Sequence, residues 1–183
     1  MYNIWIILYT LVIIGLEIIM FFKVDGIGLT FERIFKAFLL KFLLAAIITT
    51  FNYLVLTDYL SYFIEPLFGL SLSFLLLRGL SKRLLFFYGL FPIVLMDIFY
   101  RSVSYFVFPF FGQGIVDGDG NPVFLLIMLF VCSIVLVFLK WLDYDFTRLR
   151  KEFLDKGFQQ SLTKINWIMG AYFLVMENLS YFD

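Results

Sequence analysis

The sequence predicts an all-α protein, a polytopic transmembrane helix bundle. Of its 183 residues, 63% are hydrophobic and 22% are aromatic, and the mean hydropathy is +0.98. Soluble domains average about 45–50% apolar residues, so this chain would leave too little polar surface to face water. Its apolar residues also fall into stretches of about 20, the length that a helix needs to cross a bilayer core of roughly 30 Å. We therefore expect a single membrane-embedded domain over residues 1–183, without linkers or internal repeats.

Six apolar segments are predicted to span the membrane. They are Ile4–Phe22, Ala37–Leu56, Tyr59–Leu77, Leu84–Phe111, Val123–Trp141 and Ile165–Tyr181. The third contains Pro66, a residue that favours the first turn of a helix, so this span must begin near Tyr59 and tolerate the Glu65–Pro66 pair. The fourth would be about 42 Å long if fully helical. We expect it to tilt, to kink at Pro92, or to leave the membrane before Pro109.

The first segment has the features of a membrane span and lacks those of a cleaved signal peptide, because no basic region precedes it and no small-residue cleavage site follows it. Basic residues lie in three clusters between alternate pairs of spans. The clusters are Lys23, Arg33, Lys36 and Lys41; Arg78, Lys82 and Arg83; and Lys140, Arg148, Arg150, Lys151, Lys156 and Lys164. Residues 57–64 and 112–122 include no Lys or Arg. The positive-inside rule places the clusters in the cytoplasm and the N-terminus outside.

The segment Asp143–Lys164 spaces Phe146, Leu149, Phe153 and Leu154 at helical intervals, with basic residues between them. This pattern is typical of a short amphipathic helix on the inner membrane face. A solvated connector with positive-inside charge explains it equally well, and the sequence leaves both interpretations open.

Asp97 and Arg101 lie four residues apart within the fourth span, on the same face of a helix. An ionised group at mid-bilayer costs a few kcal/mol, and pairing lowers that cost, so we expect an ion pair within the helix. The pair either fixes how the bundle packs, or belongs to a switchable polar network or a site open to the outside. Proton or ion conduction is a third interpretation, but no second polar stripe continues such a path.

Besides Asp97, two carboxylates are predicted in the membrane: Glu17 in the first span and Glu177 in the sixth. Glu17 is expected to pair with Arg101 or to lie near the inner interface, beside Lys23. Lys41 is expected to extend its amine to the inner interface, as long basic side chains do.

The predicted outer face combines aromatic residues with acids and has no bases. The acids are Asp58, Glu65, Asp117, Asp119 and Asp183, and the aromatics include Tyr59, Tyr62, Phe63, Tyr105, Phe108, Phe110, Phe111, Tyr181 and Phe182. An interfacial aromatic belt accounts for the rings. A surface of acids and rings would also suit a cationic amphipathic peptide.

Several kinds of chemistry are excluded by residue types. The chain contains no histidine, which removes zinc-peptidase, histidine-base and His-ligated metal sites. Its one cysteine, Cys132, cannot form an intrachain disulfide. Residues 117–121, "DGDGN", resemble the start of a calcium loop, but no Glu occupies the twelfth position. An intramembrane peptidase is excluded for want of paired catalytic acids. We expect no metal and no cofactor.

Residues 87–108, "FYGLFPIVLMDIFYRSVSYFVF", followed by "GQGIV" at 112–116, resemble one family. The match is to the fourth transmembrane helix and following outer loop of streptococcal peptide-pheromone receptor histidine kinases of the Com/Blp type, distantly related to the Agr type. Weaker similarity lies at Glu65–Leu67 and in "RLRKEF" at 148–153. The matching residues are Tyr88, Gly89, Pro92, Asp97, Phe99, Arg101, Gln113 and Gly114.

The resemblance implies that an N-out bundle of six or seven helices in the bacterial cytoplasmic membrane binds a secreted cationic peptide. In that family a homodimer then transmits the signal to a cytoplasmic histidine kinase and a response regulator; nucleic acid is not a partner. This chain lacks the seventh helix and any phosphoacceptor histidine, so we expect the sensor part alone, or a truncated product. The candidate ligand-binding or switch residues are Glu17, Asp58, Glu65, Asp97, Arg101, Tyr105, Gln113 and Glu177.

A membrane protein that does not signal is the alternative, either a bacteriocin immunity protein or a transporter subunit. A transporter would be expected to show repeat-related broken helices, and the sequence has no internal symmetry. An immunity protein would need no kinase domain.

Overall fold

The computed structural model describes residues 4–55, 59–111, 122–142 and 156–182. These residues form six α-helices and one short 3-10 helix, which confirms the all-α class. The helices are α1 (Ile4–Val24), α2 (Phe31–Val55), the 3-10 helix η1 (Tyr59–Phe63), α3 (Ile64–Leu76), α4 (Lys82–Phe111), α6 (Pro122–Trp141) and α8 (Lys156–Phe182).

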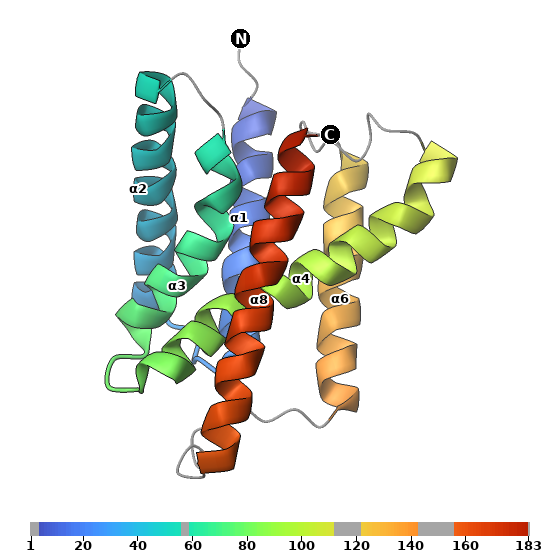
Figure 1. Ribbon diagram of the computed structural model, residues 1–183. Helices are drawn as coiled ribbons and strands as arrows, with labels where there is room; N and C mark the ends of the chain where they lie inside the picture. The colour runs from blue at the N-terminus through green and yellow to red at the C-terminus, as the bar shows by residue number, and fades with distance from the viewer. Residues whose placement is uncertain (1–3, 56–58, 112–121, 143–155, 183) are drawn as a thin grey trace.

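Helices α1, α2, α6 and α8 run roughly alongside one another, α3 is inclined to them, and α4 crosses the bundle obliquely (Figure 1). Helix α2 lies at one edge of the bundle, where it packs against α1 and α3. Helix α4 starts below α3, passes α8 and ends beyond α6. Because α4 touches α1, α3, α6 and α8, its oblique course ties the two halves of the bundle together.

Within the described residues, three helices are long and apolar enough to cross a membrane: Ile7–Val24, Phe31–Val55 and Lys82–Val103. Two further apolar helices, Ile64–Leu76 and Leu125–Trp141, are shorter. Together these five helices suggest a multi-pass membrane protein.

The sixth predicted span, Ile165–Tyr181, lies within α8. The described part of α8 is not among the helices that are long and apolar enough to cross a membrane. Its first half includes Gln159, Gln160, Lys164 and Asn166, which lower its hydropathy. The prediction of six spans is therefore supported in part.

Helix α2 begins six residues before the predicted Ala37, and a capping residue explains the difference. The hydroxyl of Thr30 accepts a hydrogen bond of 3.4 Å from the backbone N–H of Arg33, which is the geometry of an N-cap. Ser81 caps α4 in the same way, through the N–H of Leu84. A helix starts at its cap and not at its first apolar residue, so hydropathy places both starts too late.

The third predicted span is helical from Tyr59 to Leu76 but changes type within it, from the 3-10 helix η1 to α3 at Ile64. Pro66 lies in the first turn of α3, where its missing N–H has no helical partner to lose. Helix α4 continues as one helix through Pro92 and Pro109. Its axis is inclined to those of α1, α2, α6 and α8 (Figure 1), and its candidate span, Lys82–Val103, ends before Pro109.

The predicted inner segment Asp143–Lys164 falls partly outside the described residues, since 143–155 are not described. Residues 156–164 form the first turns of α8 and continue into the predicted sixth span without a break. Helix α8 thus begins nine residues before the predicted sixth span. Phe146, Leu149, Phe153 and Leu154, on which the expected surface helix depends, lie outside the described residues.

Helices α3 and α4 cross at a contact made of small residues. A Cβ added to Gly69 would lie 2.2 Å from the carbonyl oxygen of Gly89, and a Cβ added to Gly89 would lie 2.8 Å from the Cα of Leu70. One turn along α3, the buried Ser73 hydroxyl lies 2.8 Å from the Leu85 carbonyl oxygen on α4. Small residues spaced by four allow backbones to approach closely in membrane bundles, and this contact sets the position of α4.

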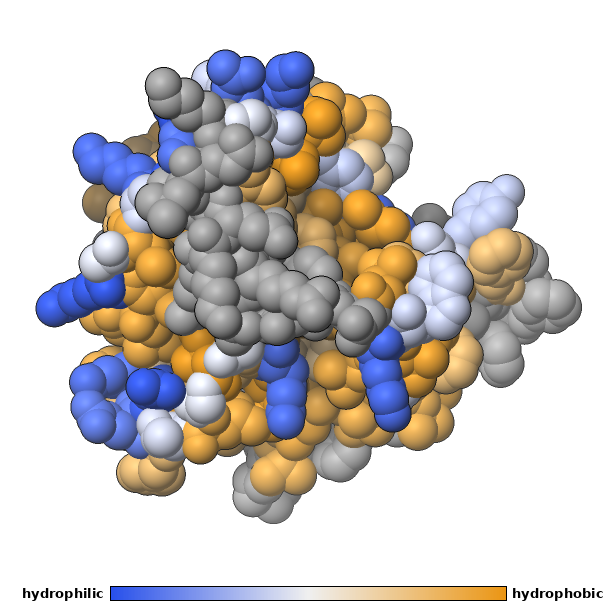
Figure 2. All heavy atoms as spheres, turned by 90° about the horizontal axis from the view of Figure 1, so that it is seen from below, coloured by the Kyte–Doolittle hydropathy of each residue, from blue (hydrophilic) through white to orange (hydrophobic). Residues whose placement is uncertain are grey.

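One end of the bundle is basic. The C-terminal end of α1, the N-terminal ends of α2 and α4 and the C-terminal end of α6 lie together there (Figure 1). Exposed basic residues at this end are Lys23, Arg33, Lys36, Arg78, Lys82, Arg83, Lys140 and Lys164. Figure 2 shows hydrophilic side chains around the rim of this end, with apolar side chains between them. The positive-inside rule predicts that this is the cytoplasmic end.

Candidate functional site

Lys41 of α2 lies inside the bundle, where it contacts carboxylates from two other helices. Its side chain is 8% exposed, and its Nζ pairs with Glu17 of α1 and lies 2.8 Å from Oε1 of Glu65 on α3. The Nζ also lies 5.2 Å from the ring centroid of Phe68, a cation–π distance. The three charged groups therefore connect α1, α2 and α3 through one ammonium group.

The depth of this cluster explains why its charges are paired. Lys41 is ten residues into α2, so it lies about 15 Å along the helix axis from Phe31. That distance is too great for its side chain to reach the basic end of the bundle. Removing a charge from water costs several kcal/mol, and two carboxylates at hydrogen-bonding distance offset part of that cost. The expectation that Lys41 extends to the inner interface is wrong.

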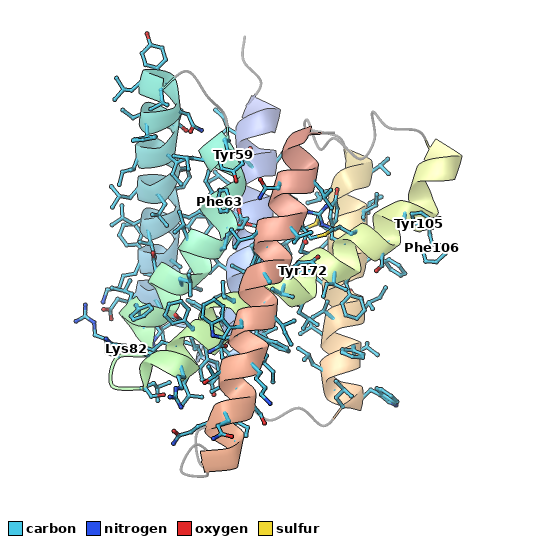
Figure 3. The ribbon with its side chains drawn as sticks, viewed as in Figure 1. Tyr59, Phe63, Lys82, Tyr105, Phe106 and Tyr172 are labelled. Carbon is cyan, nitrogen blue, oxygen red and sulfur yellow. The ribbon has the colours of Figure 1, made fainter. Side chains whose placement is uncertain are left out.

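Asp97 and Arg101 of α4 form the ion pair expected from their spacing. Arg101 Nε lies 2.8 Å from Oδ2 of Asp97. The same carboxylate oxygen accepts a hydrogen bond of 2.7 Å from the hydroxyl of Tyr172. In Figure 3, Tyr172 lies at mid-height of α8, where that helix passes α4. The pair is therefore more than a contact within α4, because it also holds α8.

Carboxylates of the Lys41 cluster and of the Asp97–Arg101 pair border one cavity of about 240 Å³. Glu17, Glu65 and Asp97 all line it. Its remaining lining is apolar or aromatic and comes from α1, α3, α4, α6 and α8: Phe21, Phe68, Pro92, Ile93, Met96, Tyr100, Met128 and Phe173. The cavity therefore touches five helices and brings three carboxylates, far apart in the sequence, into one space.

Further polar contacts hold α8 against the bundle at other heights. Asn166 donates a hydrogen bond of 2.8 Å to the carbonyl of Arg83 on α4, and the Tyr59 hydroxyl of η1 donates one of 3.1 Å to Asn178. Tyr172 lies between Asn166 and Asn178 along α8. The contact of Tyr172 with Asp97, which lines the cavity, is therefore the middle one of three polar contacts along α8.

Three of the predicted site residues, Glu17, Glu65 and Asp97, line this cavity, and a fourth, Arg101, pairs with Asp97. The prediction that Glu17 pairs with Arg101 is wrong, because its carboxylate pairs with Lys41. Glu65, expected at the outer surface, is 42% exposed and also lines the cavity. It therefore belongs to the Lys41 cluster while remaining partly accessible.

The other predicted residues are not brought to the cavity by the described part of the structure. Tyr105 lies near the far end of α4, 78% exposed, with its ring against Phe106 (Figure 3). Asp58 and Gln113 lie outside the described residues, and Glu177 is within α8 but its side chain is not described. Gly114, part of the family-like motif, also lies outside the described residues.

Lys41 and Tyr172 are the residues that sequence reasoning missed as part of the site. For Lys41 the available signal was its position, because a base well inside an apolar helix needs a carboxylate partner. Glu17 and Glu65, within two other predicted spans, were candidates for that partner. Tyr172 gave no signal, because a tyrosine in an apolar helix is ordinary and its partner lies 75 residues away in the sequence.

Among the described residues, no group of three or more His, Cys, Asp or Glu side chains is arranged to hold a metal ion. Comparisons with protein-family models, with curated proteins and with solved structures find no match for this chain. The function is therefore inferred from the chemistry of the site and from the sequence motif.

Proposed function

We propose that this chain is the ligand-sensing membrane domain of a two-component, quorum-sensing receptor. It binds a secreted cationic peptide outside the cell and relays a helix rearrangement to a cytoplasmic histidine kinase. The observation that supports this proposal most is the convergence of charged contacts between helices on one cavity. The resemblance of residues 87–116 to pheromone receptors supplies the class of ligand and the class of output.

The geometry gives a ligand a way to change helix packing. Lys41 connects α1, α2 and α3, and Asp97 with Tyr172 connects α4 and α8. A ligand group that contacts Glu65 or Asp97 competes with those contacts, so binding changes the relative stability of two packings. A ligand shifts such an equilibrium only by its difference in affinity for the two states. A site that borders five helices is well placed to have such a difference.

The charge of the site suits a cationic ligand. Three carboxylates face two bases, so the cluster has a net charge of −1 when all five groups are ionised. Charge complementarity favours basic partners and repels acidic ones. In this proposal the receptor acts as a homodimer in the bacterial cytoplasmic membrane, and the response regulator is reached through a kinase domain beyond these 183 residues.

The test uses the gene with its natural downstream sequence in its own host. Cells are exposed to the peptide fraction of their culture medium, and the induced transcriptional response is measured over a full dose range. We expect Asp97→Ala and Arg101→Ala to reach the membrane at normal levels and to lose most of the response. Glu32→Ala and Arg33→Ala, an acid and a base exposed at the basic end of α2, are the matched controls and should respond normally.

Two results would contradict the proposal. One is a normal dose response from both cavity variants. The other is a transcriptional response that survives deletion of the gene, while the deleted cells become sensitive to killing by the peptide fraction. That second pattern is expected of an immunity protein.

A further inference from the structure

The carboxylates and the bases of the site occupy different positions relative to the cavity. Glu17, Glu65 and Asp97 all line it, whereas neither Lys41 nor Arg101 is among the described residues that do. The described wall therefore carries three acidic side chains and neither of the bases that pair with them. A group that enters the cavity lies beside these acidic side chains.

Aromatic rings make up much of the remaining wall. Phe21, Phe68, Tyr100 and Phe173 line the cavity from α1, α3, α4 and α8. The faces of aromatic rings attract ammonium and guanidinium groups, and the attraction strengthens where water is excluded. Phe68 already has the ammonium of Lys41 at 5.2 Å from its centroid. Rings and carboxylates together form a cage for an organic cation.

The size of the cavity limits what it can hold. At about 240 Å³ it is smaller than the pockets of about 300–1,000 Å³ that hold drug-sized ligands. Ile93, Met96 and Met128 provide an apolar part of the wall beside the carboxylates. A charged head on a short aliphatic stem fits both parts of this wall.

We propose that the cavity is a binding site for one monovalent organic cation, an alkylammonium or alkylguanidinium group on a short apolar stem. The cationic head lies between Glu65 and Asp97, among the aromatic rings, and the stem lies against Met96 and Met128. The same chemistry is offered by a free amine and by a Lys or Arg side chain of a peptide. The second source rests on the proposed function, whereas the cation site itself does not.

The methionines offer a direct test. The chain has six, Met1, Met20, Met96, Met128, Met169 and Met176. Of the five that the structure describes, Met96 and Met128 line the cavity. The protein, labelled with ¹³C at the methionine methyl groups and placed in lipid nanodiscs, is titrated with n-butylammonium and n-butylguanidinium while methyl resonances are recorded. n-Butanol is the neutral control of the same length.

We expect saturable shifts at Met96 and Met128, with Met20 and Met169 unchanged and no saturable shift with butanol. Glu65→Gln should weaken butylammonium binding about tenfold, because it removes one charge-assisted contact. This variant leaves Lys41 paired with Glu17, so the fold is retained. Asp97→Asn is the second variant, and Glu32→Gln, far from the cavity, should bind as the wild type. Equal shifts with butanol, shifts spread over all methionines, or unchanged affinity in both cavity variants would overturn the proposal.

A second arm distinguishes the two sources of the cation. Acetyl-Leu-Lys-Leu-amide is compared with the same peptide in which norleucine replaces lysine. If the lysine peptide alone shifts Met96 and Met128, a peptide side chain can occupy the site. If butylammonium binds and neither peptide does, the cation site stands as a site for free amines, and the peptide-receptor proposal loses its support. Absence of binding by butylammonium, butylguanidinium and the peptides alike overturns the cation site and leaves the transcriptional test of the receptor unaffected.

Discussion

Lys36 and Lys41 lie on the same helix, α2, and each pairs with a glutamate, but their surroundings differ. Lys36 is half exposed and pairs with the exposed Glu32 of its own helix, whereas Lys41 is buried and pairs with carboxylates of two other helices. Exposed ion pairs contribute about 0–1 kcal/mol. Loss of one partner of a buried pair costs about 3–5 kcal/mol, because the other charge is left uncompensated.

Lys41→Met is therefore expected to lower the free energy of unfolding by about 3–5 kcal/mol. Thermal unfolding of the purified protein in detergent micelles measures the change. Lys36→Met, the matched control on the same helix, should change it by less than about 1 kcal/mol. Adding Glu17→Gln to Lys41→Met should restore part of the loss. Equal stability of the two lysine variants would mean that the charge cluster does not hold the helices.

Tyr172→Phe tests the contact between α4 and α8 without changing the size of the ring. The variant removes the hydroxyl that donates to Asp97, a hydrogen bond to a charged group, which contributes about 1.5–3 kcal/mol. The unfolding midpoint should fall accordingly. Tyr105→Phe, exposed at the far end of α4, is the control and should leave it unchanged. A fall of the same size in the control would show that the loss of any tyrosine hydroxyl, and not this contact, is responsible.

At the scale of the helices, the crossing of α3 and α4 depends on two glycines and a serine. The backbones meet at Gly69 and Gly89, and Ser73 lies beside them. Asp97 follows Gly89 on α4, and Glu65 precedes Gly69 on α3. The crossing of the two helices therefore fixes where Asp97 lies relative to Glu65. The cavity between them is thus positioned by a contact that contains no charge.

Gly69→Ala is expected to destabilise the protein by about 1–3 kcal/mol, the usual cost of overpacking, because the new Cβ would overlap the Gly89 carbonyl and α4 must shift. The matched control is Gly170→Ala in α8, where an added Cβ meets nothing within 4 Å. The control should be neutral or slightly stabilising, since Ala is the better helix former by about 1 kcal/mol. Unfolding midpoints and butylammonium affinities of both variants are compared. A neutral Gly69→Ala would mean that the helices do not approach this closely.

The sequence was informative where the physical cause is local. Hydropathy located the helices to within a few residues, except at the starts of α2 and α8, which lie six and nine residues before the predicted ones. The spacing of Asp97 and Arg101 predicted their pair. The sequence did not predict the features that depend on contacts between helices. The Lys41 cluster joins three helices, the oblique course of α4 depends on a Gly–Gly contact, and Tyr172 meets Asp97 across 75 residues. No periodicity in a single helix reports which face will meet which neighbour.

For the molecule as a whole, the basic end predicts orientation. In a Cys132→Ser background, single cysteines at Asn121 and Ser81 are labelled in intact cells with a membrane-impermeant maleimide. The absence of Lys and Arg from residues 112–122 and the basic residues around Ser81 place the first outside and the second inside. Asn121→Cys should be labelled in intact cells, and Ser81→Cys only after lysis. The reverse pattern would invert the topology and put the proposed peptide site on the wrong side.

The central claim is that these helices are the sensing half of a receptor kinase, and the coding DNA beyond codon 183 tests it most directly. The claim predicts that the reading frame continues into a seventh apolar helix, then a helix with a phosphoacceptor histidine, and then an ATP-binding domain. A reading frame that stops there, or that encodes no kinase domain, would contradict it. The cavity would then belong to a membrane protein that binds its ligand without passing a phosphoryl signal inward.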